Sequence, residues 1–441
     1  NWCPIGNDSI YTKGHLIAVF EDNKIKIFNC TGPEGKKRKL KFQKMLKTPK
    51  NSIAKMSRIV RMISSLLQKI PHKQIWIISD RHHMGGDNGQ ALFEYIRKNK
   101  TDVNAYYAID GDSSTYKEVK HLGHVLKLDS KKYKFYFSIS DAVVSSHFDT
   151  TELYAFDYKY LKEQISRKKF VFLQHGITKD DVSNYYSRDK QRIDLFVTAT
   201  RAEQLSIINN GNYLLNENRV GLLGFPRYDK LKNLKEKIIV IAPTWRNNLV
   251  SFKGKGVEPI VDSKFFDSYY FRFYHELMSS EKLHIKMEEK GYRLCYLPHF
   301  NLVPTNMYFE DIDDISIIKD NERNYNLLFS KASLWVTDYS STAFDFAYLK
   351  KPVVYCQGDK DEFFMNHTYT KGYFDVERDG FGPISHSVEE TIELIIHYLE
   401  NDCVLEQNYE DRINKTFAFI DNNNSERVYK AIKGMVKNER Y

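Results

Sequence analysis

The chain has 441 residues, of which 42% are hydrophobic and 28% charged, so it is expected to fold into two or three globular domains rather than to be disordered. Basic residues exceed acidic ones by nine, but thirteen basic residues and no acidic one lie between Lys36 and Lys73, which leaves 53 basic against 57 acidic residues elsewhere. Because a nucleic-acid-binding protein usually carries its basic surface on the folded body, this distribution argues against a nucleic-acid partner.

The cysteines and the hydropathy exclude further classes. The five cysteines are scattered and include no Cys-x-x-Cys pair, which argues against a disulfide framework or a zinc ribbon and fits a reducing cytosol. No run of eighteen apolar residues is present, so the sequence predicts neither a membrane-spanning helix nor a signal peptide. Because the first residue is Asn1 rather than Met, we expect a piece of a longer protein, with a processed N-terminus as the alternative.

Residues 1–35 are expected to form a small β structure. Two short apolar runs, at residues 15–20 and 25–28, are separated by four polar residues, and this pattern predicts a β-hairpin. We interpret residues 1–35 as a remnant or extension of a preceding domain.

Residues 36–72 form a basic segment. From Ile53 onward its apolar residues recur at steps of three and four, which predicts a helix with an apolar stripe and a basic rim. Such a helix could attach to an anionic membrane surface, where each basic residue contributes about 1 kcal/mol, or it could pack on its own protein with a solvated outer face. The absence of acidic residues favours the membrane, and we expect a cytoplasmic protein that is peripheral on the inner face of the cell membrane.

From residue 73 the chain alternates between strands and helices in two series. Strands are expected at residues 74–79, 104–109, 124–128, 142–145, 170–173, 195–198 and 220–223, then at 238–242, 293–297, 316–318, 334–337 and 352–356. Most are unbroken apolar runs, as expected of strands buried on both faces of a parallel sheet. The sequence therefore predicts two α/β domains, 73–232 and 233–441, with a linker at 229–237, three closing helices and a cleft between the domains.

Two histidines each lie two residues after the end of a predicted strand, where ligands bind in open parallel sheets. His175 precedes Gly176, which lets the backbone turn and approach a ligand, and His299 follows Pro298. A histidine with a pKa of about 6.5 is mostly neutral near pH 7 and can accept a proton. Each histidine could instead cap its strand by hydrogen bonding. Because the two lie at matching strand ends of facing domains, we predict that one acts as a base while the other stabilises charge.

A third strand end carries Asp338, Ser340 and Ser341, and a helix is expected to begin at Thr342. Thr342 and Asp345 have the spacing of a capping box. The free N–H groups of the helix start, its dipole and the serine hydroxyls favour an anion such as a phosphate. The alternative is that the serines only cap the helix.

Thr244 and Arg246 follow the first strand of the second domain. Arg246 could clamp a phosphate bidentately or pair with a carboxylate. The loop at residues 80–89 contains glycines but lacks the signatures of a dinucleotide site or a P-loop. Since no carboxylate cluster or complete set of zinc ligands is present, we expect neither a metal nor a cofactor.

Taken together, these segments resemble the CDP-glycerol:poly(glycerophosphate) glycerophosphotransferase family, which includes teichoic acid primases and polymerases and related capsule polymerases. The matching motifs follow the family's order: D-N-G-Q-A-L-F-E-Y-I from residue 87, Q-H-G at 174–176, G-F-P-R-Y-D at 224–229, A-P-T-W-R at 242–246 and T-D-Y-S-S at 337–341. The resemblance extends from about residue 73 to residue 395. The chain departs from the family at 297–300, where L-P-H-F replaces the usual R-P-H-P, and in the loop at 177–181.

The resemblance implies a GT-B fold with two Rossmann-like domains, an acceptor domain first and a donor domain second. It implies that His175 is the base, that His299 contacts the donor's diphosphate and that Ser340 and Ser341 bind phosphate. The expected donor-binding residues are Gly176, Thr244, Arg246, Pro298, Asp338, Ser340, Ser341 and Thr342.

The implied reaction transfers glycerol phosphate or ribitol phosphate from a CDP-alcohol to a hydroxyl of a teichoic-acid-like or capsular polymer, or of a lipid-linked saccharide, and releases CMP. A GT-B glycosyltransferase that uses a nucleotide sugar is the first alternative. A membrane-bound scaffold that binds nucleotide without turnover is the second.

Overall fold

The computed structural model describes residues 72–147, 153, 168–251, 260–319, 323–366 and 370–437, and near the N-terminus residues 10–13, 16–21, 24–38, 40, 59, 62–63 and 66. Most of the basic segment predicted at 36–72 therefore lies outside the described residues. Among the helices in the described part of the chain, none combines the length and apolar character needed to cross a bilayer.

The N-terminal residues form a small antiparallel sheet. Strand β2 (Leu16–Glu21) pairs with β3 (Lys24–Asn29), which confirms the predicted hairpin. Strand β1 (Ile10–Lys13) adds a third strand on the other side of β2 that the sequence did not predict.

The first large sheet has seven parallel strands in the order β10-β9-β8-β7-β4-β5-β6. Its strands are β4 (Gln74–Ser79), β5 (Val103–Ile109), β6 (Val125–Lys127), β7 (Ala142–Ser145), β8 (Lys169–Phe172), β9 (Leu195–Thr198) and β10 (Val220–Leu222). Its helices are α3 (Asn88–Asn99), α4 (Ser114–Val119), α5 (Lys131–Ile139), α7 (Ser183–Tyr186) and α8 (Arg201–Asn209). The predicted strands of this domain are confirmed to within one or two residues.

The second large sheet has six parallel strands in the order β15-β14-β11-β16-β17-β18. They are β11 (Ile238–Ile241), β14 (Arg293–Tyr296), β15 (Ile315–Ile317), β16 (Leu334–Thr337), β17 (Val353–Cys356) and β18 (Ile384–Ser385). The helices are α9 (Tyr269–Met278), α10 (Glu281–Lys290), α11 (Tyr325–Lys331), α12 (Thr342–Tyr348), α13 (Lys360–Asn366), α14 (Val376–Asp379), α15 (Val388–Glu400) and α16 (Gln407–Thr416). The sequence missed β18 and the short pair β12 (Val250–Ser251) and β13 (Ile260–Val261).

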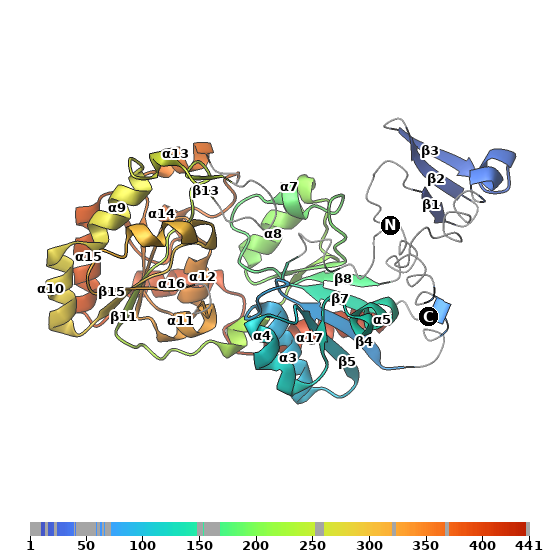
Figure 1. Ribbon diagram of the computed structural model, residues 1–441, viewed down its shortest axis with the longest axis horizontal. Helices are drawn as coiled ribbons and strands as arrows, with labels where there is room; N and C mark the ends of the chain where they lie inside the picture. The colour runs from blue at the N-terminus through green and yellow to red at the C-terminus, as the bar shows by residue number, and fades with distance from the viewer. Residues whose placement is uncertain are drawn as a thin grey trace.

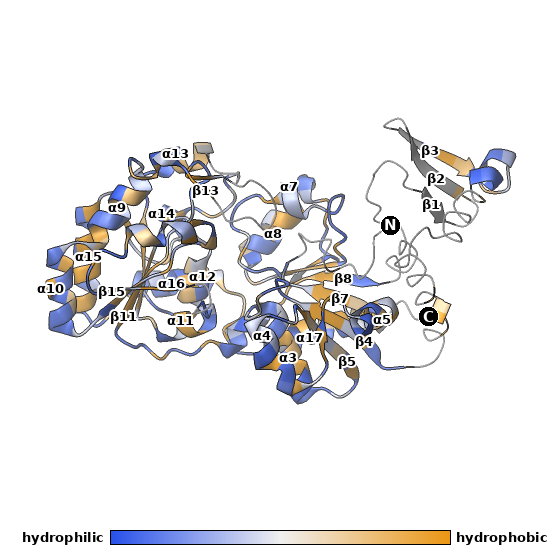
Figure 2. Ribbon diagram, viewed as in Figure 1, coloured by the Kyte–Doolittle hydropathy of each residue, from blue (hydrophilic) through white to orange (hydrophobic). Residues whose placement is uncertain are grey.

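The apolar strands lie inside both domains because helices cover both faces of each sheet (Figure 1). Strand β4 is buried along its whole length, and so is β11. The helices turn their polar faces outward around these apolar strands (Figure 2). Burial on both faces explains why the strands read as continuous apolar runs rather than as an alternating pattern.

The last helix, α17 (Asn424–Lys437), corrects the predicted domain boundary, because it packs on the first sheet although it ends the chain. The Tyr429 ring lies 5.7 Å from the Trp76 ring of β4, and the Gln74 side chain donates to the carbonyl of Lys433 at 3.2 Å. Asp229, at the start of the predicted linker, accepts the N–H of Ser425 at 2.7 Å. The range 233–441 therefore contains a helix of the first domain, and residue 229 holds that helix in place.

Candidate active site

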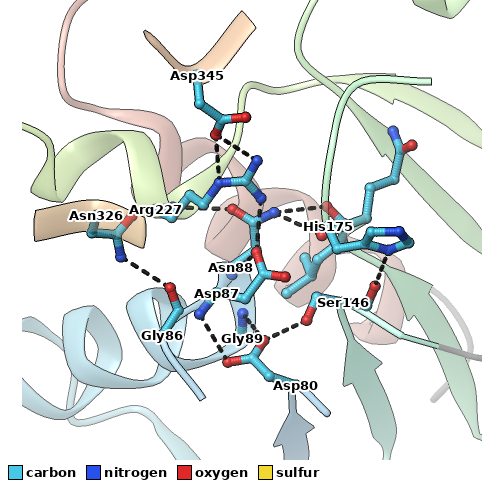
Figure 3. Close-up of polar contacts among 12 residues, drawn as sticks. Asp80, Gly86, Asp87, Asn88, Gly89, Ser146, His175, Arg227, Asn326 and Asp345 are labelled. Atoms are coloured by element: carbon cyan, nitrogen blue, oxygen red, sulfur yellow. Dashed lines mark hydrogen bonds and ion pairs between the residues drawn. The ribbon is translucent and has the colours of Figure 1, made fainter. Parts of the chain in front are cut away.

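A buried arginine joins the two domains where their strand ends meet (Figure 3). Arg227 lies in the 3-10 helix η4 (Pro226–Lys230) and donates through Nη1 to Asp87, just before α3, at 2.7 Å. Its Nε and Nη2 donate to Oδ1 of Asp345 in α12 at 2.8 and 2.6 Å. A second contact between the domains runs from the Asn326 amide to the carbonyl of Gly86 at 2.9 Å. These hydrogen bonds hold the carboxyl ends of the strands of the first sheet at a fixed distance from those of the second sheet.

The turn that carries His175 is held in a strained conformation. Gln174 has φ +61°, in the left-handed region that residues other than glycine rarely adopt. The Asn88 amide donates to the carbonyl of Gln174 at 2.7 Å, and Asn88 Oδ1 accepts the N–H of Arg227 at 3.1 Å. The Arg227 network therefore reaches the residue directly before His175.

A buried carboxylate holds the other side of this turn. Glu203, in α8, accepts the side-chain amide of Gln174 at 2.9 Å and the N–H of Thr178 at 2.7 Å. Its second oxygen accepts the N–H of Ala199 at 2.8 Å. Burial raises the pKa of Glu203 to about 7. The residues on both sides of His175 are thus fixed to a single side chain.

His175 is arranged as a proton acceptor. Its Nδ1 lies 3.4 Å from the carbonyl oxygen of Ser146; since a carbonyl only accepts, this contact places the proton on Nδ1 and leaves Nε2 unprotonated. One side of the His175 side chain is exposed to solvent, and the other is buried against the protein. This burial lowers the pKa of His175. The negative charge of Asp87 opposes the shift, and the positive charge of Arg81 adds to it. The imidazole is therefore neutral near pH 7 and can take up a proton.

Asp80 organises the protein beneath His175. One carboxylate oxygen accepts the hydroxyl of Ser146 at 2.5 Å and the N–H of Gly89 at 2.7 Å (Figure 3). The other oxygen accepts the N–H of Gln90 at 2.9 Å. Burial, with a contribution from Asp87, raises the pKa of Asp80 to about 6. Asp80 thus ties the start of α3 to the residue whose carbonyl faces His175.

Three residues that the sequence analysis did not select for the site connect His175 to His299: His147, Arg81 and Phe300. The His147 ring stacks on the His175 ring, with centroids 4.4 Å apart, and its Nε2 accepts from Arg81 Nε at 3.0 Å. The Arg81 guanidinium lies 4.6 Å from the centroid of the Phe300 ring in the second domain, and that ring is 4.1 Å from the His299 ring. The predicted histidines are therefore linked across the domains through intermediate side chains. His147 is the second residue after β7. Its place at a strand end was the feature of the sequence that could have identified it as a site residue.

The serine-rich turn of the second domain lies against the His175 loop. A Cβ added to Gly176 would be 2.7 Å from Oγ of Ser341, so the two domains are in contact at this point. The hydroxyl of Ser340 accepts from the N–H of Thr342 at 3.2 Å. The predicted capping box is wrong, because Asp345 binds Arg227 instead of turning back to the helix start.

Arg246 and Asp338 occupy positions beneath the site rather than at its surface. Arg246 is buried and pairs with Asp338 at 2.9 Å and with Asp359 at 2.8 Å. Asp338 also accepts the N–H of Thr244 at 2.8 Å. The predicted phosphate clamp is therefore corrected: two buried carboxylates engage the Arg246 guanidinium, and the network aligns two strand ends.

The remaining predicted residues lie nearby. Nδ1 of His299 accepts the N–H of Asn301 at 3.3 Å, and its ring stacks 6.0 Å from that of Trp245. The carbonyl of Pro298 accepts from Arg323 at 2.6 Å. Thr244 is buried, with a hydroxyl that makes no hydrogen bond to any described residue.

A pocket that is partly open to solvent lies beside the serine-rich turn. The first domain contributes Lys179 and Asp180 to its lining, and the second contributes Ser340, Gln357 and Lys371, among others. The backbone N–H of Asp181 donates across the domains to the carbonyl of Thr370 at 2.9 Å, next to this cavity. The arrangement can hold a polar ligand between the two domains, with one end at Ser340.

Comparison with known proteins gives consistent matches. A family model described as CDP-glycerol:poly(glycerophosphate) glycerophosphotransferase matches residues 60–434. The minor teichoic acid biosynthesis protein GgaB of Bacillus subtilis (strain 168) is 33% identical over 419 residues, which cover 94% of this chain and 44% of that protein. The teichoic acid poly(glycerol phosphate) polymerase of the same strain is 24% identical over 435 residues, which cover 90% of this chain and 54% of that protein. The chain thus spans about half the length of these relatives.

A solved structure shares the fold. It is that of a variant of the wall teichoic acid polymerase TagF soaked with CDPG, and it superimposes with a TM-score of 0.62 at 17% sequence identity, covering 93% of this chain and 100% of that chain. This likeness confirms the GT-B arrangement of two Rossmann-like domains.

Proposed function

Because this chain belongs to the CDP-glycerol:poly(glycerophosphate) glycerophosphotransferase family, we propose that it transfers glycerol phosphate from CDP-glycerol to a hydroxyl of a teichoic-acid-like polymer and releases CMP. The observation that carries the proposal is the contact between Gly176 and Ser341. It brings a neutral histidine of one domain next to the hydroxyl-rich turn of the other.

In this mechanism His175 is the general base. The acceptor hydroxyl gives its proton to Nε2 of His175, and its oxygen forms a bond to the β-phosphorus of the donor. The bond from that phosphorus to the bridging oxygen breaks, and the electron pair leaves with CMP. The Ser146 carbonyl holds the protonated Nδ1 and so keeps Nε2 directed away from the protein.

The second domain supplies stabilisation for the diphosphate. The hydroxyls of Ser340 and Ser341 and the imidazole of His299 donate to its oxygens in this proposal. Phosphoryl transfer depends on such positioning and on electrostatic stabilisation, because the protein makes no covalent bond to the substrate.

The proposal is tested by offering CDP-glycerol, CDP-ribitol and a UDP-sugar separately, each with a lipid-linked acceptor, and measuring the nucleotide released. CMP release from CDP-glycerol is expected. H175A should lower the rate by about 10²- to 10⁴-fold, the usual contribution of a general base, whereas H386A, at an exposed histidine outside the site, should not change it. Release of UDP alone would support the glycosyltransferase instead, and full activity of H175A would remove the base assignment.

The basic segment at 36–72 is proposed to hold the enzyme on the inner, anionic face of the cell membrane, near its acceptor. The support is its charge, since thirteen basic and no acidic residues lie between Lys36 and Lys73. Flotation with phosphatidylglycerol vesicles at low salt should recover the full chain, and replacement of lysines 36, 37, 39 and 41 by glutamine should weaken this recovery. Equal recovery with neutral phosphatidylcholine vesicles would contradict an electrostatic attachment.

A further inference from the structure

Arg81 lies between His175 and His299, the two histidines predicted to be catalytic. It follows β4 by two residues and so lies at the carboxyl edge of the first sheet. Its Nε donates to His147, whose ring stacks on the His175 ring, and the face of its guanidinium covers Phe300, next to His299. Among the described residues, Arg81 is thus in contact with both halves of the site.

The end of the Arg81 guanidinium has no acceptor within the described parts of the chain. Within those parts, Arg81 makes contact through Nε and through the face of its guanidinium, and no carboxylate pairs with it there. Two other arginines near the site, Arg227 and Arg246, differ from Arg81, since carboxylates neutralise both. Arg81 is also only partly buried, so its two Nη groups can reach a ligand.

From this placement we infer that Arg81 binds the phosphoryl group under transfer, through its Nη groups and the non-bridging oxygens of the donor's β-phosphate. The inference deepens the proposed function and rests on it. A guanidinium presents two parallel N–H donors that match two phosphate oxygens. Arg81 exchanges no proton and forms no bond; it stabilises the charge on the equatorial oxygens while the acceptor oxygen approaches and CMP leaves.

The position of His147 supports this role. His147 accepts from Nε of Arg81, so it fixes the orientation of the guanidinium fork without using the Nη groups. Burial lowers the pKa of His147 well below its ordinary value, so the ring remains a neutral acceptor for Arg81. The positive charge of Arg81 also acts on His175, where it favours the unprotonated form that a base requires.

The kinetic test compares R81Q and R81K with R293Q. Arg293 is an exposed residue at the opposite end of β14 from His299, so it serves as a matched control. R81Q should lower kcat for CDP-glycerol by about 10²- to 10³-fold, the cost of removing one donor to a developing oxyanion, with a smaller change in KM. R81K should restore part of kcat because it keeps the charge but loses the fork, and R293Q should match the wild type.

A positioning role through His147 makes a different prediction. If Arg81 acted only by holding His147, H147F would reproduce the loss, and R81Q would cost nothing further in the H147F background. We expect R81Q to lower kcat further in that background. The absence of any further loss would overturn the inference.

A binding measurement separates this inference from the proposed function. Calorimetry with inorganic pyrophosphate should give at least tenfold weaker binding for R81Q than for the wild type and for R293Q. Unchanged pyrophosphate binding in R81Q would overturn the Arg81 assignment even in an active enzyme. A third outcome is that pyrophosphate binding depends on Arg81 but the wild type releases no CMP. This outcome would overturn CDP-glycerol as the donor, while Arg81 would remain part of an anion-binding site.

Discussion

Replacement of Arg227 by methionine should destabilise the protein strongly, because it removes the charge that joins the domains. The Asp345 side chain is only 4% exposed, and its Oδ1 accepts both Nε and Nη2 of Arg227. Asp87 is 19% exposed and keeps its bond from the N–H of Asn88 at 2.8 Å after the substitution. The cost therefore falls mainly on Asp345, as an uncompensated buried carboxylate.

Removing one partner of a buried ion pair costs about 3–5 kcal/mol of the free energy of unfolding. The matched control is R378M, since Arg378 is 68% exposed and pairs with Asp379. An exposed pair of this kind contributes about 0–1 kcal/mol. Both variants remove a guanidinium: that of Arg227 is buried between two carboxylates of different domains, and that of Arg378 is exposed beside one neighbouring carboxylate.

Equilibrium unfolding in urea, followed by circular dichroism, measures both changes. R227M should lower the midpoint far more than R378M and should separate the unfolding of the two domains into two transitions. D345L in the R227M background should recover part of the loss, because it removes the unpaired charge. A loss for R227M no larger than that for R378M would refute the argument that this triad holds the domains together.

Two further substitutions test the turn that carries His175. G176A should lower kcat/KM at least tenfold, because its Cβ would approach Oγ of Ser341 to 2.7 Å, while G211A, at a site with open space, should be neutral; equal activities would contradict the close contact. Burial raises the pKa of Glu203 from 4.5 to about 7, so its contribution to stability is complete below pH 4.5 and is lost as the pH rises through 7. E203Q should therefore flatten the dependence of Tm on pH between 4.5 and 7, and an unchanged slope would show that Glu203 does not titrate in this range.

The sequence determined which segments form most strands of the two large sheets, because burial on both faces produces unbroken runs of apolar residues. Strands β4, β7, β9 and β16 have the bounds read from the apolar runs. The positions of His175, His299 and Ser340 at strand ends were predicted for the same reason, since in a parallel sheet the strand end is also the ligand edge.

Only the tertiary structure decided how those strand ends combine. Arg227 and Asp345 are 118 residues apart, and Arg246 and Asp359 are 113 apart, so no local pattern shows that one pair joins the domains and the other aligns strands beneath the site. The same holds for α17, which follows the second domain in the chain but packs on the first sheet. Local periodicity encodes which face of an element is buried, whereas the partner of a charge or an apolar face depends on where the rest of the chain lies.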